Sequence, residues 1–89
     1  MTNVIEVRYW AAAKSAAGTA GDRLEFDGTI TMADVVRRAA ELHPGTRLPE
    51  VLAVCSALIG DQPVGTADPG GIEVPPGSTV EFLPPFAGG

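Results

Sequence analysis

The residues of this sequence that could take part in chemistry lie in its last six positions, the run PPFAGG. Pro84 and Pro85 have a fixed φ and stiffen the chain, so the segment projects from what precedes it. Ala87, Gly88 and Gly89 then have a minimal cross-section and wide backbone freedom. Such a tail can enter a narrow tunnel that a branched side chain would block. The reactive group that it carries is the α-carboxylate of Gly89, which at pH 7 is an anion and a poor electrophile.

This carboxylate needs activation before it can react. Transfer of an adenylyl group from ATP would give a mixed anhydride that a sulfur or amine nucleophile can attack. The sequence has no glycine-rich loop with a lysine that could hold the phosphates of ATP. We therefore expect the chain to be a substrate and carrier that is not catalytic by itself. ATP would be consumed by a partner enzyme, and no cofactor would be bound permanently.

Two other side chains with chemical potential are Cys55 and His43, each the only residue of its kind. One cysteine allows no intramolecular disulfide, and one thiol with one imidazole is a poor zinc site, so no metal is predicted. We expect Cys55 to be buried and inert, with a role in sulfur relay as the less favoured alternative. His43 stands before Pro44, where it is expected to contact the last carbonyls of a helix or solvent.

The local patterns predict strands around one convincing helix. Residues 31–45 have apolar side chains at helical spacing, a Thr31–Asp34 pair typical of a capping box, and a Pro-Gly stop. Residues 11–22 are small and patternless, which suggests a long connection. Alternating, β-branched or apolar runs predict the strands, with a turn near Gly60 and Asp61; these runs are residues 4–10, 23–28, part of 51–65, a short piece at 72–74, and 79–83.

This order of elements predicts an α+β fold of the β-grasp, ubiquitin-like type. It has a mixed sheet of four to five strands with one main helix packed across it, and its first and last strands are parallel neighbours. The length allows a single domain. We expect residues 1–83 to form it and residues 84–89 to be a flexible tail.

The alternation in the first and last strands predicts an apolar partner surface. Trp10 points outward with Glu6 and Arg8, and Leu83 points outward with Glu81. Parallel pairing would bring Trp10 and Leu83 close together beside Phe86. Clustered apolar groups outside a core usually mark a binding surface, and tryptophan is a frequent anchor. The alternative is that Trp10 folds over an edge of the sheet or against the alanine-rich segment. Tyr9 points inward, where its hydroxyl needs a partner.

The end of the sequence, VEFLPPFAGG, resembles that of the MoaD/ThiS family of sulfur carriers. The family pattern Phe-Pro-Pro-Val-Ala-Gly-Gly corresponds to residues 83–89, with Leu83 in place of the first aromatic residue and Phe86 in place of valine. The segment YWAAAKSAAG is similar to the family's segment after the first strand, with Lys14 where a basic residue is common. The Pro-Pro pair favours the molybdopterin branch, the small subunit of molybdopterin synthase, over the carriers for thiamine or cysteine synthesis.

The resemblance implies a cycle of reactions at Gly89. An E1-like adenylyltransferase (MoeB-like) adenylates the carboxylate, and a sulfur donor converts it to a thiocarboxylate. The tail, residues 84–89, then inserts into a large synthase subunit (MoaE-like), which builds the dithiolene of molybdopterin, and Trp10, Leu83 and Lys14 would lie at the interface. A ubiquitin-like modifier, whose Gly89 becomes linked to lysines, stays open as an alternative, as does a plain binding module.

The composition favours a cytoplasmic, acidic protein. Eleven Asp and Glu against six Lys and Arg give a formal charge of −5, and no basic run occurs. Nucleic acids and anionic membranes are therefore poor partners. Neither a signal peptide nor a membrane-spanning run is expected.

Overall fold

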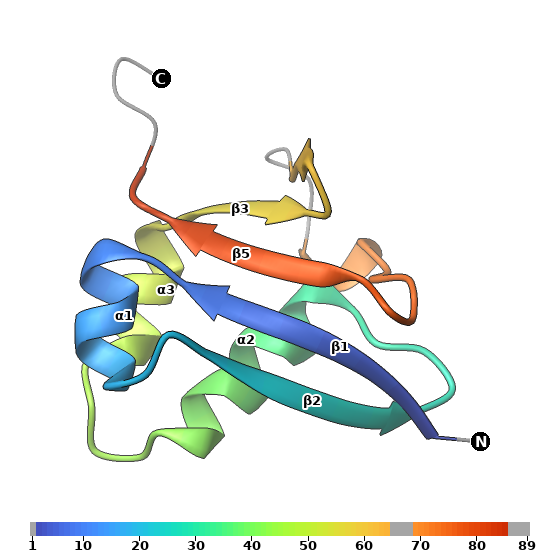
Figure 1. The fold of residues 1–89 in the computed structure, drawn as a ribbon, viewed down its shortest axis with the longest axis horizontal. Coiled ribbons are helices and arrows are strands. Elements are labelled where there is room, and N and C mark those ends of the chain that lie inside the picture. Colours follow the sequence, from blue (N-terminus) through green and yellow to red (C-terminus); the bar gives the residue numbers. More distant parts are fainter. Residues whose placement is uncertain (1, 65–68, 86–89) are drawn as a thin grey trace.

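The computed structural model describes residues 2–64 and 69–85 of the chain (Figure 1). Phe86, Ala87, Gly88 and Gly89 lie outside the described residues, as does Asp68. The described part contains five strands and three α-helices. In chain order these are β1 (Thr2–Tyr9), α1 (Ala11–Ala17), β2 (Gly21–Asp27), α2 (Met32–Leu42), α3 (Leu48–Val54), β3 (Ser56–Ile59), β4 (Gln62–Pro63), a 3-10 turn η1 (Pro69–Gly71) and β5 (Thr79–Leu83).

The strands form one mixed sheet in the order β2-β1-β5-β3-β4. Strand β1 is antiparallel to β2, and β3 is antiparallel to both β4 and β5. The first and last strands are parallel neighbours, as predicted, with Glu6 opposite Thr79 and Tyr9 opposite Phe82. Both strands therefore end at the same edge of the sheet (Figure 1).

The core lies between the helices and one face of the sheet, which we call the inner face. The inward residues that the alternation predicts on β1 and β5 are all buried; they are Ile5, Val7, Tyr9, Val80 and Phe82. Leu24 of β2 and Val35 and Ala39 of α2 complete this layer. The opposite face, the outer face, holds Glu6 and Arg8, which are exposed. Burying this one apolar layer is the main stabilising contribution of the sheet.

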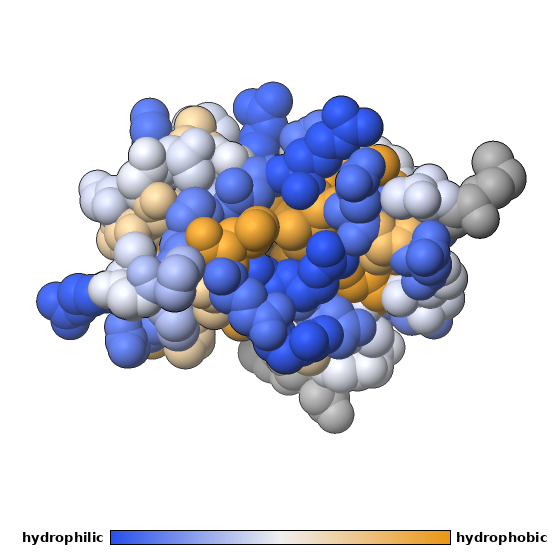
Figure 2. Space-filling view, turned by 90° about the horizontal axis from the view of Figure 1, so that it is seen from below, coloured by the Kyte–Doolittle hydropathy of each residue, from blue (hydrophilic) through white to orange (hydrophobic). Residues whose placement is uncertain are grey.

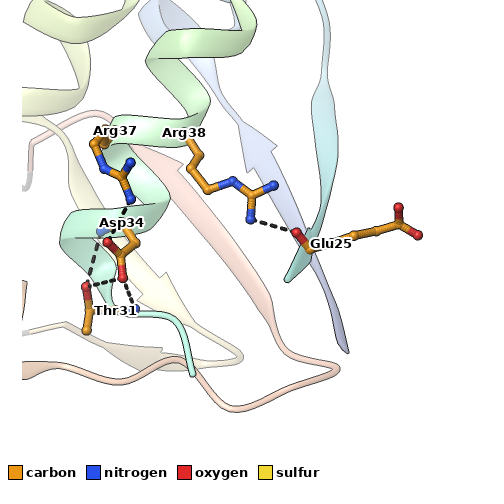
Figure 3. A network of polar contacts seen from close by, with 5 residues as sticks. All are labelled: Glu25, Thr31, Asp34, Arg37 and Arg38. Atoms are coloured by element: carbon orange, nitrogen blue, oxygen red, sulfur yellow. Dashed lines mark hydrogen bonds and ion pairs between the residues drawn. The ribbon is translucent and has the colours of Figure 1, made fainter. Parts of the chain in front are cut away.

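Helix α2 is the predicted helix, and its first turn is fixed by the predicted capping box (Figure 3). The Asp34 amide donates to Thr31 Oγ1 at 3.2 Å, and the Thr31 amide donates back to Asp34 Oδ2 at 3.1 Å. Arg37 donates to Asp34 Oδ1 at 2.9 Å. These hydrogen bonds and the ion pair lower the pKa of Asp34 below its ordinary value. The helix ends at Leu42, two residues before Pro44.

A second side chain of α2 reaches an edge of the sheet. Arg38 donates to the backbone carbonyl of Glu25 at 2.7 Å (Figure 3). Strand β2 is an edge strand, and an unpaired carbonyl there is a site where another chain could add a strand. Figure 2, which views the side of the molecule on which β2 lies, shows apolar surface crossed and bordered by hydrophilic side chains. Because Arg38 donates to the Glu25 carbonyl, this position of the β2 edge is no longer free to pair with another strand.

The main helix is confirmed, but two further helices were not predicted, since residues 11–17 and 48–54 are also helical. Helix α1 was predicted as a loop, since alanine shows no amphipathic pattern. Alanine has the highest helix propensity, and Ala13 and Ala17 pack into the core on one side of α1. Gly18 ends α1 in the left-handed conformation, with φ at 76°. Helix α3 occupies part of the run in which a strand was predicted, and that strand is limited to Ser56–Ile59.

A close approach of two strands limits one position to glycine. Gly21 lies opposite Arg8 at the start of β2. A Cβ atom on Gly21 would collide with the backbone carbonyl oxygen of Val7, which cannot move without displacing β1. Gly21 therefore allows the short connection between α1 and β2 to rejoin the sheet beside the end of β1.

Candidate functional site: the edge where β1 and β5 end

The parallel pairing of β1 and β5 places Trp10 at the base of the tail. Trp10 directly follows Tyr9, the last aligned residue of β1, and its amide donates to the carbonyl of Phe82 at 3.0 Å. Leu83 follows Phe82 and Pro84 follows Leu83, so the chain leaves the sheet within two residues of this hydrogen bond. The prediction that Trp10 and Leu83 stand at the same ends of neighbouring strands is confirmed by this register.

The Trp10 side chain stands on the outer face. It is 45% exposed, and its Nε1–H donates to Glu81 Oε1 at 3.1 Å. Glu81 lies between Arg8 of β1 and Leu58 of β3 in the sheet. The indole is thus held by a hydrogen bond to the neighbouring strand while nearly half of it stays in contact with water. An aromatic group held in this way has lost part of its conformational freedom before any partner binds.

Other apolar side chains share the outer face of the sheet with Trp10. Leu83 is half-buried and opposite Ser56. Leu58 shares the outer face, because it is opposite Glu81, and Pro63 of β4 is opposite Leu58. We call this set the tail-edge patch; it consists of Trp10, Leu58, Pro63, Leu83, Pro84 and Pro85, of which the three prolines are exposed. Leu58 and Pro63 were not predicted, because their faces depend on a strand whose limits were wrong.

Charged side chains accompany this patch on the outer face. Glu6, Arg8 and Glu81 lie on its two central strands, and Arg23 is opposite Glu6 on β2. The signs alternate, so the face has no single strong charge. A partner would contact an apolar centre with a mixed polar border, which is the usual composition of a protein interface.

On the inner side of the same edge, a polar network joins three elements. Tyr9 Oη donates to Asp22 Oδ2 at 2.8 Å, and His43 Nε2 lies 2.6 Å from the same oxygen. The Tyr9 ring stacks on Phe82 and meets the edge of His43. Burial, followed by the hydrogen bond to Asp22 and its charge, raises the pKa of Tyr9 far above its ordinary value. The Tyr9 hydroxyl was predicted to need a partner, and the structure identifies this partner as Asp22.

The expectation for His43 is wrong. Its backbone amide donates to the carbonyl of Ala40, but its imidazole contacts Asp22, which is 21 residues away in sequence. This pair joins the end of α2 to the start of β2. No local pattern in the sequence indicates it, because it depends on how the helix crosses the sheet.

Two further sequence expectations concern Cys55 and metals. Cys55 ends α3 and is half-buried, and burial raises the pKa of its thiol. A raised pKa reduces the thiolate fraction, as expected for an inert cysteine. Among residues 2–64 and 69–85 no group of three His, Cys, Asp or Glu side chains could hold a metal ion. None of the helices in that part of the chain is long and apolar enough to cross a membrane.

Helix α1 forms one wall of a groove that the sequence does not predict. The groove is open, has a volume of about 620 Å³ and lies between α1 and α3. Its lining consists mostly of small side chains from α1, namely Ala12, Ser15 and Ala16, with Thr46, Arg47 and Val51 opposite. Arg47 is the one charged residue among those that line the groove, so the groove contains no cluster of ionisable side chains.

The arrangement of strands and helices defines the class of fold. The strand order, the parallel first and last strands and the main helix across the sheet are those of a β-grasp, ubiquitin-like α+β domain, as predicted. No protein-family model matches the sequence, and no curated protein was found to be similar to it.

Solved structures of the same fold were found. SAMP1 from Haloferax volcanii has a TM-score of 0.74 and 20% identity, over 97% of this chain and 99% of that one. A Pyrococcus furiosus protein provisionally described as molybdopterin converting factor, subunit 1, has a TM-score of 0.72 and 16% identity, over 94% and 99%. The small archaeal modifier protein 1 (SAMP1) from Methanosarcina acetivorans has a TM-score of 0.71 and 20% identity, over 100% and 99%. At these identities the similarity establishes the ubiquitin-like fold.

Proposed function

We propose that this chain is a cytoplasmic sulfur carrier, the small subunit of a molybdopterin synthase, and that its working group is the carboxylate of Gly89. An E1-like adenylyltransferase would adenylate this carboxylate with ATP. A sulfur donor would displace AMP and leave a thiocarboxylate. The sulfur would then be used, inside a large synthase subunit, to build the dithiolene of molybdopterin.

The observation that carries this proposal is the position of the tail-edge patch. Exposed Trp10 and half-buried Leu83 stand at the point where Pro84 begins the tail. A partner that covers this patch would hold the base of the tail in a fixed position. The terminal carboxylate would then react with an oriented neighbour instead of by random encounter, which lowers the entropic part of the barrier.

The other residues assigned to the site have lesser roles in the proposal. Pro84 and Pro85 are exposed and would keep the start of the tail extended. Phe86 would add a third anchor, and Ala87 and Gly88 would pass through a narrow channel in the partner. Lys14 is exposed on α1 and would lie at the border of the interface.

Intact mass tests the proposal directly. The full chain is incubated with ATP, the candidate E1-like enzyme and a sulfur source, and a thiocarboxylate should raise its mass by about 16 Da, the exchange of one oxygen for sulfur. The reaction without ATP is the control. If no such species forms with enzyme and donor that are active on another carrier, the proposal is wrong.

A second candidate is a ubiquitin-like protein modifier. It is favoured by the similarity of fold to two proteins named SAMP1, small archaeal modifier protein 1. In this case the activated Gly89 would form amide bonds with lysines, and adducts of high mass would replace the thiocarboxylate. Carriers for thiamine or cysteine synthesis would give the same species, heavier by about 16 Da. These pathways are distinguished by offering the thiocarboxylate form to the sulfur-accepting enzyme of each pathway and measuring which of them takes up the sulfur.

A further inference from the structure

Lys14 is the one lysine of this chain. The sequence has six Lys and Arg residues, and five of them are arginine, at positions 8, 23, 37, 38 and 47. An arginine side chain stays protonated at all physiological pH values and has no free electron pair for attack on a carbonyl. A lysine loses its proton far more easily and becomes a nucleophile. Lys14 therefore carries the one side-chain amine of these 89 residues that an activated carboxyl group could acylate.

The surroundings of Lys14 leave this amine accessible. Its exposed neighbours along α1, Ala11, Ser15 and Gly18, are all small. The first turn of α1 has no acidic residue. Within residues 2–64 and 69–85, no ion pair or hydrogen bond engages the Lys14 amine. Along α1 an incoming carbonyl group therefore meets small side chains and no carboxylate, and the bulky neighbour is Trp10, one helical turn earlier and 45% exposed.

The fold places Lys14 near the tail edge, but on a different side from the one by which the chain leaves β5. Its amide donates to the carbonyl of Trp10 at 3.4 Å, so Lys14 is one helical turn from the residue that is bonded to Phe82. In Figure 1, α1 descends on one side of the ends of β1 and β5, and the chain leaves β5 on the other side. The fixed φ angles of Pro84 and Pro85 oppose an immediate return of the tail. A second copy has no such restriction.

We propose that Lys14 is the acceptor site for Gly89 of a second copy, so that this chain forms conjugates with itself. The inference rests on the proposed activation of Gly89. The neutral Lys14 amine attacks the carbonyl carbon of the Gly89 adenylate, a C–N bond forms, the bond to the AMP oxygen breaks, and AMP leaves. The ammonium proton passes to water. The product is an isopeptide-linked dimer, and ATP supplies the activation.

A preformed thioester tests the acceptor site without any activating enzyme. The full chain is prepared with a thioester at Gly89 and incubated in a mildly alkaline buffer without any enzyme. After hydrolysis of the remaining thioester, we expect a product with twice the mass of the unmodified chain less about 18 Da, the water lost in forming one amide. Digestion after glutamate should leave the remnant 82–89, released after Glu81, on the peptide 7–25 that contains Lys14. The yield should rise with protein concentration.

Two variants provide the controls. Lys14→Arg keeps the positive charge at this position but removes the nucleophilic amine, so its thioester should form no conjugate. The double variant Lys14→Arg/Arg47→Lys moves the lysine to another exposed position, three residues before Glu50. Because that carboxylate stabilises the protonated amine, we expect a rate lower by about threefold or more. Equal rates, a remnant found on the Met1 amine, or a monomer closed on itself would each contradict the assignment.

The two proposals fail in different ways. If the enzyme produces the thiocarboxylate but the thioester gives no conjugate at Lys14, the sulfur-carrier function stands and the acceptor site is wrong. If the thioester reacts at Lys14 but no enzyme activates Gly89, the acceptor site stands and the proposed function is wrong.

Discussion

Tyr9 and Trp10 are neighbours in sequence, yet they belong to opposite faces of the same edge of the sheet. Tyr9 is 1% exposed, and its hydroxyl is bonded to a carboxylate that also meets His43. Trp10 is 45% exposed and has one hydrogen bond, to Glu81. Phe82 and Leu83 repeat this division on β5, since Phe82 is buried and Leu83 is half-buried. Buried and solvent-accessible side chains thus alternate at the ends of two adjacent strands.

The largest expected effect on stability comes from the buried member of the β5 pair. Phe82→Ala should reduce the free energy of unfolding by about 3–5 kcal/mol, because a large aromatic side chain leaves a cavity beside Tyr9. Leu83→Ala should reduce it by less than about 1.5 kcal/mol, since Leu83 already contacts water. Urea unfolding of the two variants measures both values. Similar losses would contradict the division between the two faces.

A smaller effect is expected at Trp10, where the substitution should change the affinity for a partner more than the stability of the fold. Trp10→Ala should weaken binding to the large subunit that we propose as partner by more than about 1 kcal/mol, as interface anchors do. Its free energy of unfolding should change by less than it does in Phe82→Ala. Leu42 of α2 is a matched control, because it is 50% exposed and belongs to the helical layer, not to the outer face of the sheet. Leu42→Ala should leave the affinity unchanged in calorimetry. If both substitutions have equal effects on the affinity, the tail-edge patch is not the binding surface.

The inner network should contribute about 1 kcal/mol through the Tyr9 hydroxyl, which Tyr9→Phe removes. The raised pKa of Tyr9 also predicts the form of the pH dependence. The unfolded chain loses this proton near pH 10, while the folded chain keeps it, so wild-type stability should decline as the pH rises above about 10. Tyr9→Phe should show a shallower decline. The free energy of unfolding of both proteins is measured by urea unfolding at several pH values between 9 and 11, about one unit on either side of the ordinary tyrosine pKa. If it falls equally with pH in the wild type and in Tyr9→Phe, this role of Tyr9 is contradicted.

The smallest expected effect concerns the capping box, which is remote from the tail. The lowered pKa of Asp34 means that its stabilising contribution is present above the unfolded pKa and is lost as the pH falls through the folded value. Asp34→Asn should therefore lose stability at neutral pH and show a weaker dependence on acid. Partner affinity should be unchanged, because the helix start lies on the other side of the sheet from the tail-edge patch.

The sequence predicts best those elements whose burial pattern is local. Val80, Glu81 and Phe82 alternate cleanly between the two faces, and their strand has the limits predicted for it. The capping box of Thr31 and Asp34 is likewise formed by residues three positions apart, which is why α2 was predicted together with its cap.

The elements that the sequence missed lack such a pattern. Helix α1 buries two alanines, too little for a visible apolar stripe. The start of α3 does contain a usable signal, since Leu48, Val51 and Leu52 have helical spacing and Pro49 lies in the first turn. Contacts such as His43 to Asp22 depend on the tertiary arrangement, and no local pattern can indicate them.

The central claim is that the fold is a scaffold and that the terminal carboxylate is the working group. It is tested most directly by comparing intact masses of the wild type and a variant without Gly89 after incubation with ATP, the E1-like enzyme and a sulfur donor. The account predicts a gain of about 16 Da for the wild type alone, with the same melting temperature for both proteins. An equal gain in both, or none in either with active enzymes, would contradict it.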